Sequence, residues 1–181
     1  MSSKKNEKIN LPLCATIGVF LALAVKIFIV DFYRVKGFSM EPAIKDGQSV
    51  AALKISYGLQ NPFRPELLFC WKEPKAGDAI LYMYQNYWVV KRCAAVPGTE
   101  LSFEDDGQKH FLLAGAERIP LTSIQFHKLR TTKAVPKGYV LAIGDNYELS
   151  HDSRDYGFVP VKNVTARVIL PFASAAIAKT R

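Results

Sequence analysis

The sequence predicts a mainly β domain, formed by a coiled or partly closed antiparallel sheet, that follows a single N-terminal transmembrane helix. Three observations support this fold class. An apolar run covers residues 11–30. After it, short apolar segments alternate with glycine, proline and aspartate. No long helical period and no internal repeat follow the apolar run. Closing or coiling the sheet would protect its edge strands from pairing with other chains.

The composition excludes several classes of protein. The 181 residues are 49% hydrophobic and 22% charged, unlike a disordered chain or a transporter with many spans. Without an anchor roughly 150 residues remain, enough for one domain with a core. The net charge of +8 is spread along the chain, so no basic stripe indicates a nucleic-acid partner. It favours attraction to the anionic headgroups of a lipid bilayer.

The apolar run is long enough to anchor the chain. Its 20 residues contain one charge, Lys26, near the far end, where the side chain can reach the interface. At a rise of ~1.5 Å per residue the run matches a ~30 Å hydrocarbon core. A cleaved signal peptide would be shorter and would end in small residues, whereas this run ends in Ile-Phe-Ile-Val. The lysines at positions 4, 5 and 8 should keep residues 1–10 cytoplasmic.

Six segments of the outer domain have the pattern of strands. Gln85-Asn86 separates two of them and predicts a hairpin. The apolar tail, residues 168–178, is too short to span a membrane, so we expect a last strand and then a segment that rests on the membrane or packs on the domain. The predicted strands are residues 49–53, 78–84, 87–95, 109–113, 139–143 and 165–170.

The three cysteines give no sign of a metal site, because none has the spacing of metal ligands. Cys14 lies in the apolar run. Cys70 and Cys93 could pair on the oxidising side of a membrane, but we favour two free buried thiols. No metal or other cofactor is expected.

Ser39 lies in Gly-Phe-Ser-Met-Glu-Pro, shortly after the apolar run, and is a candidate nucleophile. A serine hydroxyl needs a neighbouring group that accepts its proton. The chain has three histidines, His110, His127 and His151. His151 lies between Ser150 and Asp152, but consecutive side chains point in different directions, so this tripeptide is not a catalytic triad. We interpret each histidine as a surface or half-buried residue.

Lys91 is the other candidate base. It lies in an apolar strand and shares a face with Val89 and Cys93. Burial would lower its pKa from the reference value of ~10.4, so that a neutral amine could accept the serine proton. The strand pattern alone leaves open a lysine that points to water. A further polar loop, residues 144–159, follows an apolar strand and is typical of a site or of a fold-supporting network.

Together these stretches resemble the type I signal peptidases, the serine–lysine membrane proteases that remove signal peptides from exported preproteins. The matching motifs are Ser39-Met40-x-Pro42, Val90-Lys91-Arg92 followed by Pro97-Gly98, Gly144-Asp145-Asn146, Ser150-x-Asp152-Ser153-Arg154, Gly157-x-Val159, and Gly77-Asp78 before a strand. Their order and approximate spacing agree along residues 30–170.

The resemblance implies a role for each matching residue. Ser39 is the nucleophile, with its amide as one oxyanion donor, and Lys91 is the general base. Ser150 orients the lysine. A supporting shell of ion pairs and hydrogen bonds contains Asp145, Asp152, Arg154 and Arg92, with Arg92 pairing with one of the aspartates.

The resemblance also implies an organisation and a location. Residues 1–10 form the cytoplasmic N-terminus, residues 11–30 the transmembrane anchor, and residues 31–181 an extracytoplasmic catalytic β domain. The expected enzyme is a monomer, crosses the inner (plasma) membrane once, and acts on preproteins on the extracytoplasmic or periplasmic side.

The chain departs from the family pattern at several positions. Gly37 replaces a serine that gives some members a second oxyanion donor, so that donor must come from elsewhere. Ala43, Thr99 and Tyr147-Glu148 also differ, and few residues separate Pro97-Gly98 from Gly144, so the large inserted domain of some members is missing or reduced. The alternatives are a peptidase dedicated to a conjugation, pilus or organelle substrate, and an anchored β domain that binds without cleaving.

Overall fold

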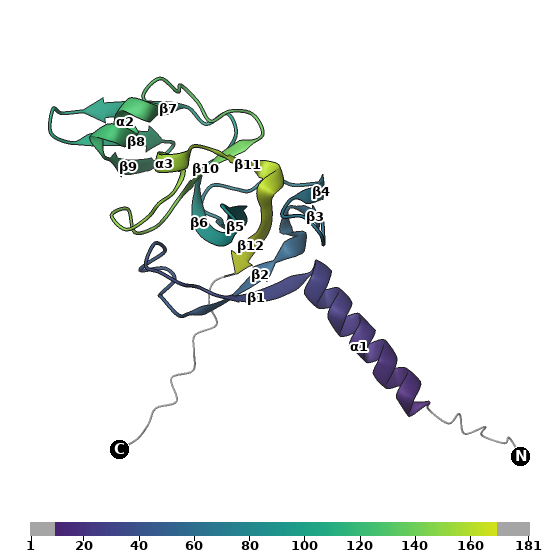
Figure 1. The fold of residues 1–181 in the computed structure, drawn as a ribbon. Helices are drawn as coiled ribbons and strands as arrows, with labels where there is room; N and C mark the ends of the chain where they lie inside the picture. The colour runs from purple at the N-terminus through teal and green to yellow at the C-terminus, as the bar shows by residue number, and fades with distance from the viewer. Residues whose placement is uncertain (1–9, 170–181) are drawn as a thin grey trace, which may run out of the picture.

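The computed structural model describes residues 10–169, in which one helix projects from a mainly β domain (Figure 1). The elements, in chain order, are α1 (Leu11–Phe28), β1 (Val30–Arg34), β2 (Ser49–Leu53), η1 (Lys54–Ser56), β3 (Gly58–Gln60), β4 (Leu67–Cys70), β5 (Ala79–Tyr84), β6 (Tyr87–Ala95), β7 (Leu101–Asp105), β8 (His110–Ala114), β9 (Glu117–Leu121), α2 (Ser123–Leu129), β10 (Tyr139–Ile143), α3 (Ser153–Tyr156), β11 (Val159–Pro160), η2 (Val161–Asn163) and β12 (Val164–Ile169).

The main sheet has seven strands in the order β1-β2-β12-β5-β6-β10-β11, and every neighbouring pair is antiparallel. The mainly β fold class is therefore confirmed. Each of the six predicted strands is present, with bounds that agree to within one residue. The sequence missed β3, β4 and β11 because they are short, and β7 and β9 because charged residues interrupt them. It missed β1 because this strand follows the apolar run without a break.

The hairpin of β5 and β6 places the centre of the sheet. Gln85 and Asn86 have φ angles of 46° and 66°, the left-handed conformations that a two-residue type I′ turn requires. The turn sets a register in which Ile80 lies opposite Lys91. Lys91 therefore shares a face with residues of the apolar core.

A second unit lies at one end of the main sheet (Figure 1). It contains the three-stranded sheet β7-β8-β9 and α2, which begins with a capping box formed by Thr122 and Gln125. Its apolar residues join a core cluster that also includes Leu141 and Ile143 of β10. The expected inserted domain is thus reduced to this small unit.

Cys70 and Cys93 are both free thiols, but they differ in burial. Cys93 is a buried free thiol, as expected. Cys70 is also free but exposed, so the prediction that it is buried was wrong. It is the last residue of β4, whose two-stranded sheet with β3 leaves most of the strand exposed.

α1 is long and apolar enough to cross a membrane, and none of its residues is buried in the protein. It ends at Phe28, and β1 begins at Val30. The last two residues of the apolar run, 29 and 30, therefore connect the helix to the sheet and begin β1. Most of the apolar tail, residues 170–178, lies outside the described residues.

Candidate active site

Ser39 lies in the turn that follows β1, and its position is fixed from two sides. Met40 is buried in the core beside Ile44, which holds the segment against the sheet. The Ser39 carbonyl accepts a hydrogen bond of 3.0 Å from the amide of Asn146. The side chain of Ser39 is half-buried. The turn that carries the candidate nucleophile is therefore joined directly to the polar loop of residues 144–159.

Lys91, on β6, is only 4% exposed. Burial lowers the pKa of its ammonium group, because the charged form loses most of its hydration. The negative charge of Asp152 opposes this shift, and the positive charge of Arg154 adds to it. Within residues 10–169 no carboxylate lies within ion-pair distance of Lys91. The environment therefore favours the neutral amine more than a surface site would.

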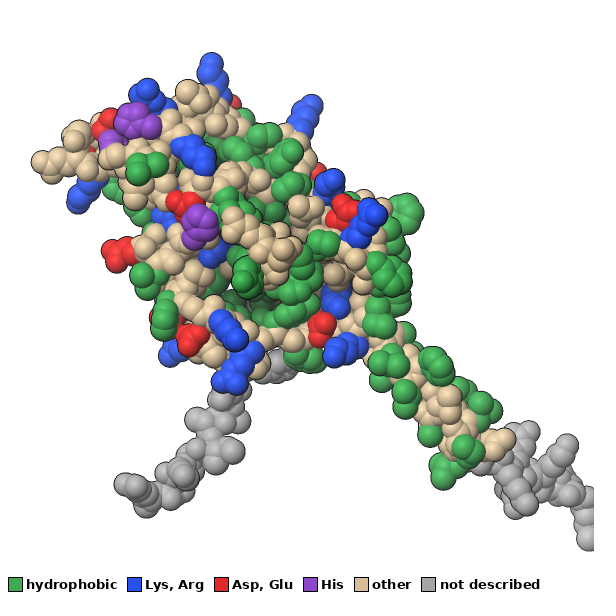
Figure 2. All heavy atoms as spheres, viewed as in Figure 1, with side chains coloured by type: hydrophobic (Ala, Val, Ile, Leu, Met, Phe, Trp, Pro, Cys, Tyr) green, Lys and Arg blue, Asp and Glu red, His purple; other side chains and the backbone are tan. Residues whose placement is uncertain are grey.

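Ser39 and Lys91 line the same groove, whose volume is ≈540 Å³. Met40, Leu81 and Val90 contribute apolar surface to it. Figure 2 shows a hollow in the β domain with apolar side chains around it. The other residues that line the groove flank Ser39 and Lys91 in the chain or come from the β5–β6 turn and the polar loop; they are Tyr33, Arg34, Val35, Lys36, Tyr84, Gln85, Tyr87, Trp88, Val89, Leu149 and His151.

Gly144 allows the nucleophile turn and the polar loop to meet. A Cβ atom at this position would lie 2.2 Å from the Ser150 hydroxyl and 2.5 Å from the Ser39 carbonyl oxygen. Only glycine permits such a close approach. The Ser150 hydroxyl is buried and has no hydrogen-bond partner in the described part of the chain.

Asp152 and Arg154 form a buried ion pair that holds the loop, with exposures of 0% and 3%. One Asp152 oxygen accepts from the Arg154 Nε at 2.9 Å, and the other accepts from the Gly144 amide at 3.0 Å. The Arg154 guanidinium also donates to the carbonyls of Tyr147 and Ser150. The pair therefore fixes both ends of the loop that contacts Ser39.

Arg92 pairs with Asp145, as the resemblance suggested for one of the aspartates. The guanidinium and carboxylate form two parallel bonds, Nε to Oδ1 at 3.0 Å and Nη2 to Oδ2 at 2.5 Å. This bidentate geometry raises the pKa of Arg92, mainly through the hydrogen bonds to Asp145. The pair connects β6, one residue after Lys91, to the start of the polar loop.

The histidines do not form a triad with Ser150 or Asp152. His151 is an exposed residue on the rim of the groove, and its Nδ1 lies 3.3 Å from Asp155 Oδ2. His127 is exposed, and His110 stacks on Phe126 with ring centroids 4.5 Å apart. The interpretation of the histidines as surface or half-buried residues agrees with these positions.

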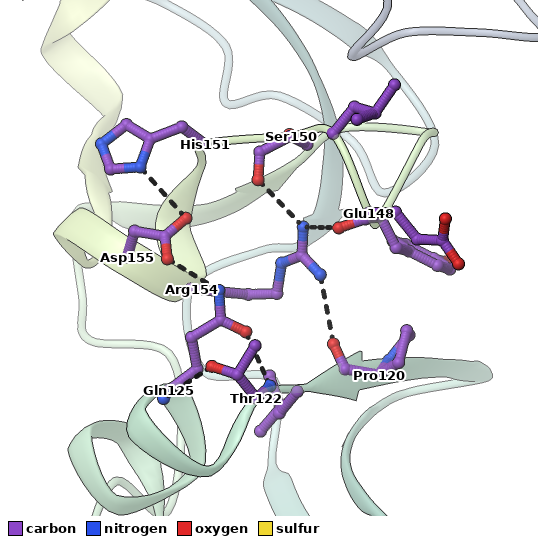
Figure 3. Close-up of a pocket in the computed structure, with 11 residues that line it drawn as sticks. Pro120, Thr122, Gln125, Glu148, Ser150, His151, Arg154 and Asp155 are labelled. Carbon is purple, nitrogen blue, oxygen red and sulfur yellow. Dashed lines mark hydrogen bonds and ion pairs between the residues drawn. The ribbon is translucent and has the colours of Figure 1, made fainter.

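The small second unit, β7–β9 with α2, also contacts the polar loop. Residues of both line a pocket between them (Figure 3). Arg154 Nη1 donates to the Pro120 carbonyl at 3.1 Å. Gln125, from the capping box of α2, donates to Asp155 at 2.7 Å. Sequence reasoning missed Pro120 and Gln125, although the capping pattern at Thr122 and Gln125 was a signal of an ordered helix there.

The resemblance implies two oxyanion donors, and within residues 10–169 the structure leaves one candidate, the Ser39 amide, without a partner. In the part of the chain that is described, nothing accepts a hydrogen bond from the Ser39 amide, which leaves it free for a substrate oxygen. The amide of Gly37 donates to Asp46 Oδ1 at 2.7 Å. Gly37 therefore supplies neither a side-chain hydroxyl nor a free amide.

Comparisons with known proteins identify the family of this chain. The family described as "Signal peptidase, peptidase S26" matches residues 9–173. The chain belongs to this family. Signal peptidase IB of Staphylococcus aureus strain N315 is 27% identical over 93% of this chain and 91% of its own length. Signal peptidase I of Buchnera aphidicola subsp. Baizongia pistaciae is 22% identical over 83% of this chain and 72% of its own length. The crystal structure of a signal peptidase I from Enterococcus faecalis V583 has a TM-score of 0.42 and 21% identity, and covers 54% of this chain and 98% of that one.

Proposed function

We propose that this chain is a membrane-anchored serine endopeptidase that removes N-terminal signal peptides from preproteins, with Ser39 as nucleophile and Lys91 as general base. The observation that carries the proposal is that a serine and a buried lysine, whose pKa is lowered by burial, line one groove in a member of the S26 family. No metal or cofactor takes part in this chemistry.

The reaction follows from the two groups. Neutral Lys91 accepts the proton of the Ser39 hydroxyl as its oxygen bonds to the scissile carbonyl carbon. The Ser39 amide donates to the oxyanion. When the tetrahedral intermediate collapses, the C–N bond breaks, and the proton from Lys91 passes to the leaving amine, which is the new N-terminus of the mature protein. Lys91 then activates a water molecule that hydrolyses the acyl-enzyme and releases the signal peptide.

Ser150 and the ion pairs position these groups. The Ser150 hydroxyl is buried without a partner, and a hydrogen bond with Lys91 would satisfy it and orient the amine. Asp152 with Arg154, and Arg92 with Asp145, hold the segments that place Ser150 and Lys91. Their role is therefore to maintain geometry rather than to transfer protons.

The sheet offers the substrate a place to bind as an added strand. β10 pairs with β6 only as far as Arg92, so residues 87–91 have one edge free of a strand. That edge lines the groove with Val35 and Lys36, which follow β1. An extended segment laid between them would reach Ser39, where Met40, Leu81 and Val90 offer apolar surface to its side chains. This fits the Ala-x-Ala preference that the resemblance implies.

The anchor places this groove at a membrane. In this proposal α1 crosses the inner membrane once, with residues 1–10 in the cytoplasm and residues 31–181 outside. Its length and apolar composition allow the span, and the lysines at positions 4, 5 and 8 favour this orientation. Cut sites lie just after the apolar part of a signal peptide, so they emerge at the membrane surface, where Ser39 would also lie. The enzyme is proposed to act as a monomer on signal-peptide-bearing preproteins.

The test uses the full chain in detergent and a preprotein whose cut is located by mass. Ser39→Ala and Lys91→Met should each abolish cleavage while the protein still inserts and folds. His127→Ala, at an exposed position, is the matched control and should cleave normally. Retained cleavage by Lys91→Met would refute the lysine base and return attention to His151, whose exchange to alanine would then shift the pH profile. Cleavage of only one of several unrelated preproteins would instead indicate a dedicated peptidase, and no cleavage of any would favour a binding domain.

A further inference from the structure

A second buried lysine, outside the groove, lies where the helix meets the sheet. Lys54 is the first residue of η1 and is 8% exposed. Its Nζ donates to the carbonyls of Lys26 at 3.2 Å and Ile27 at 3.3 Å, and pairs with Asp31 Oδ2 at 3.2 Å. Its backbone amide donates to the carbonyl of Ile29 at 2.8 Å. One residue thus contacts the last turn of α1, the connection after it and β1.

The contacts suit the end of a helix chemically. The last carbonyls of an α-helix have no partner inside the helix, and the negative end of its dipole attracts a cation. Lys54 satisfies two carbonyls near the end of α1, and Asp31 balances its charge. A lysine so engaged restricts the angle between α1 and the sheet, since a change of angle would break several bonds to a buried cation at once.

That angle decides where the groove lies relative to a bilayer. Only residue 29 separates α1 from β1, so there is no flexible linker between them that could absorb a change in the angle. The four steps from Val30 to Arg34 span ~13 Å at a strand rise of ~3.3 Å per residue. A 20° change at the junction, within the ~0–40° range of transmembrane tilts, would move the far end of β1 by ~4–5 Å. Ser39 follows five residues later and would move with it.

We infer that Lys54 and Asp31 form a clamp that fixes the angle between the membrane anchor and the catalytic sheet, and so sets the height of Ser39 above the bilayer. The inference rests on the proposed membrane-anchored function. Lys54 is then a positioning residue for substrates held in a membrane, and is not needed for the chemistry at Ser39.

The native cysteines offer a direct measurement. Cys14 on α1 and Cys70 on β4 are exposed, whereas Cys93 is buried and should not react. Nitroxide labels on Cys14 and Cys70 of the full chain in lipid vesicles would therefore report the distance between anchor and sheet by pulsed electron paramagnetic resonance. The wild type should give one narrow distance distribution. Lys54→Met should broaden it, and Lys137→Met, at an exposed position, should not.

Activity provides a second measurement. In detergent, Lys54→Met should cleave a short soluble peptide within ~2-fold of wild type, because the groove is intact. In vesicles it should cleave a membrane-inserted preprotein at least ~10-fold more slowly, since misplacement by ångströms costs orders of magnitude in rate. The wild type should also have a sharp optimum of lipid thickness, and the variant should not.

The outcomes separate the clamp from the proposed function. An unchanged distance distribution with an unchanged thickness dependence would overturn the clamp. If Lys54→Met fails to fold, Asp31→Asn tests the same idea, because it removes only the counter-charge and should broaden the distribution to a lesser degree. If the wild type cleaves no preprotein, the proposed function fails, while the distance measurement still decides whether Lys54 fixes the anchor.

Discussion

The buried pair of Asp152 and Arg154 allows a sharp test of how the active-site loop is held. Arg154→Met keeps most of the side-chain volume but leaves the Asp152 carboxylate, which is fully buried, without its cation. It also removes the donors to the carbonyls of Pro120, Tyr147 and Ser150. Breaking a buried ion pair by removing one partner costs ~3–5 kcal/mol. Since a domain of this size is stable by only ~5–15 kcal/mol, the loss is a large fraction of the total.

The expected change is large enough for a simple assay. At ~2–4 °C per kcal/mol for a domain of ~150–250 residues, Arg154→Met should lower the melting temperature by about 6–20 °C. Melting of the full chain in detergent, followed by circular dichroism, measures this. Arg118→Met is the matched control, because Arg118 forms an exposed pair with Glu104 and should cost no more than ~1 kcal/mol.

The double variant Asp152→Asn with Arg154→Met tests the cause. If the cost comes from an unpaired buried charge, removing that charge should make the double variant more stable than Arg154→Met alone. An Arg154→Met protein that melts within ~2 °C of the wild type would refute the reasoning, because the loss in unfolding free energy would then be only ~1 kcal/mol or less. A double variant that loses the sum of both single losses would show that the contacts, and not the charge, matter.

Three further expectations concern the site. Gly144→Ala should lower kcat at least ~10²-fold, because its new Cβ would displace the Ser39 carbonyl and Ser150; Gly18→Ala, where no atom lies within 4 Å, should leave kcat unchanged. In the proposed mechanism the neutral amine of Lys91 is the active form, so the rate of cleavage should rise with pH through its lowered pKa. A rise that appears only near the pKa of an exposed lysine would contradict this. Between its lowered pKa and ~10.4, Lys91 binds fewer protons in the folded protein than in the unfolded chain. The stability of the wild type relative to Lys91→Met should therefore increase with pH across that window. A difference between their urea midpoints that does not change with pH would argue against a desolvated lysine.

Local patterns in the sequence were sufficient for much of the fold. Strand alternation gave β2, β6 and β10 with their observed bounds, and Gln85-Asn86 gave the central hairpin, because both signals depend only on neighbouring residues. Short elements such as β3, β11 and α3 were missed, since a few residues carry too little periodicity to be recognised. The exposure of Cys70 was also missed, because it depends on how a small two-stranded sheet packs.

The candidate site divides in the same way. The sequence supplied the residue types and their order: Ser39 after an apolar run, Lys91 in an apolar strand, and a polar loop with Asp152 and Arg154. Motif spacing was informative because these chemistries require particular side chains. The contacts among them could not be read from spacing, since the partners lie far apart in the chain.

Taken alone, the sequence determined a mainly β chain behind an apolar helix, with a serine and a lysine as candidate groups. The tertiary structure decided the rest. It buried Lys91, which lowers its pKa, and brought Ser39 onto the same groove. It also brought two distant segments into contact at Gly144 and placed the Lys54 ammonium against carbonyls at the end of α1. Burial and close approach arise only when distant strands pair, so no local pattern could specify them.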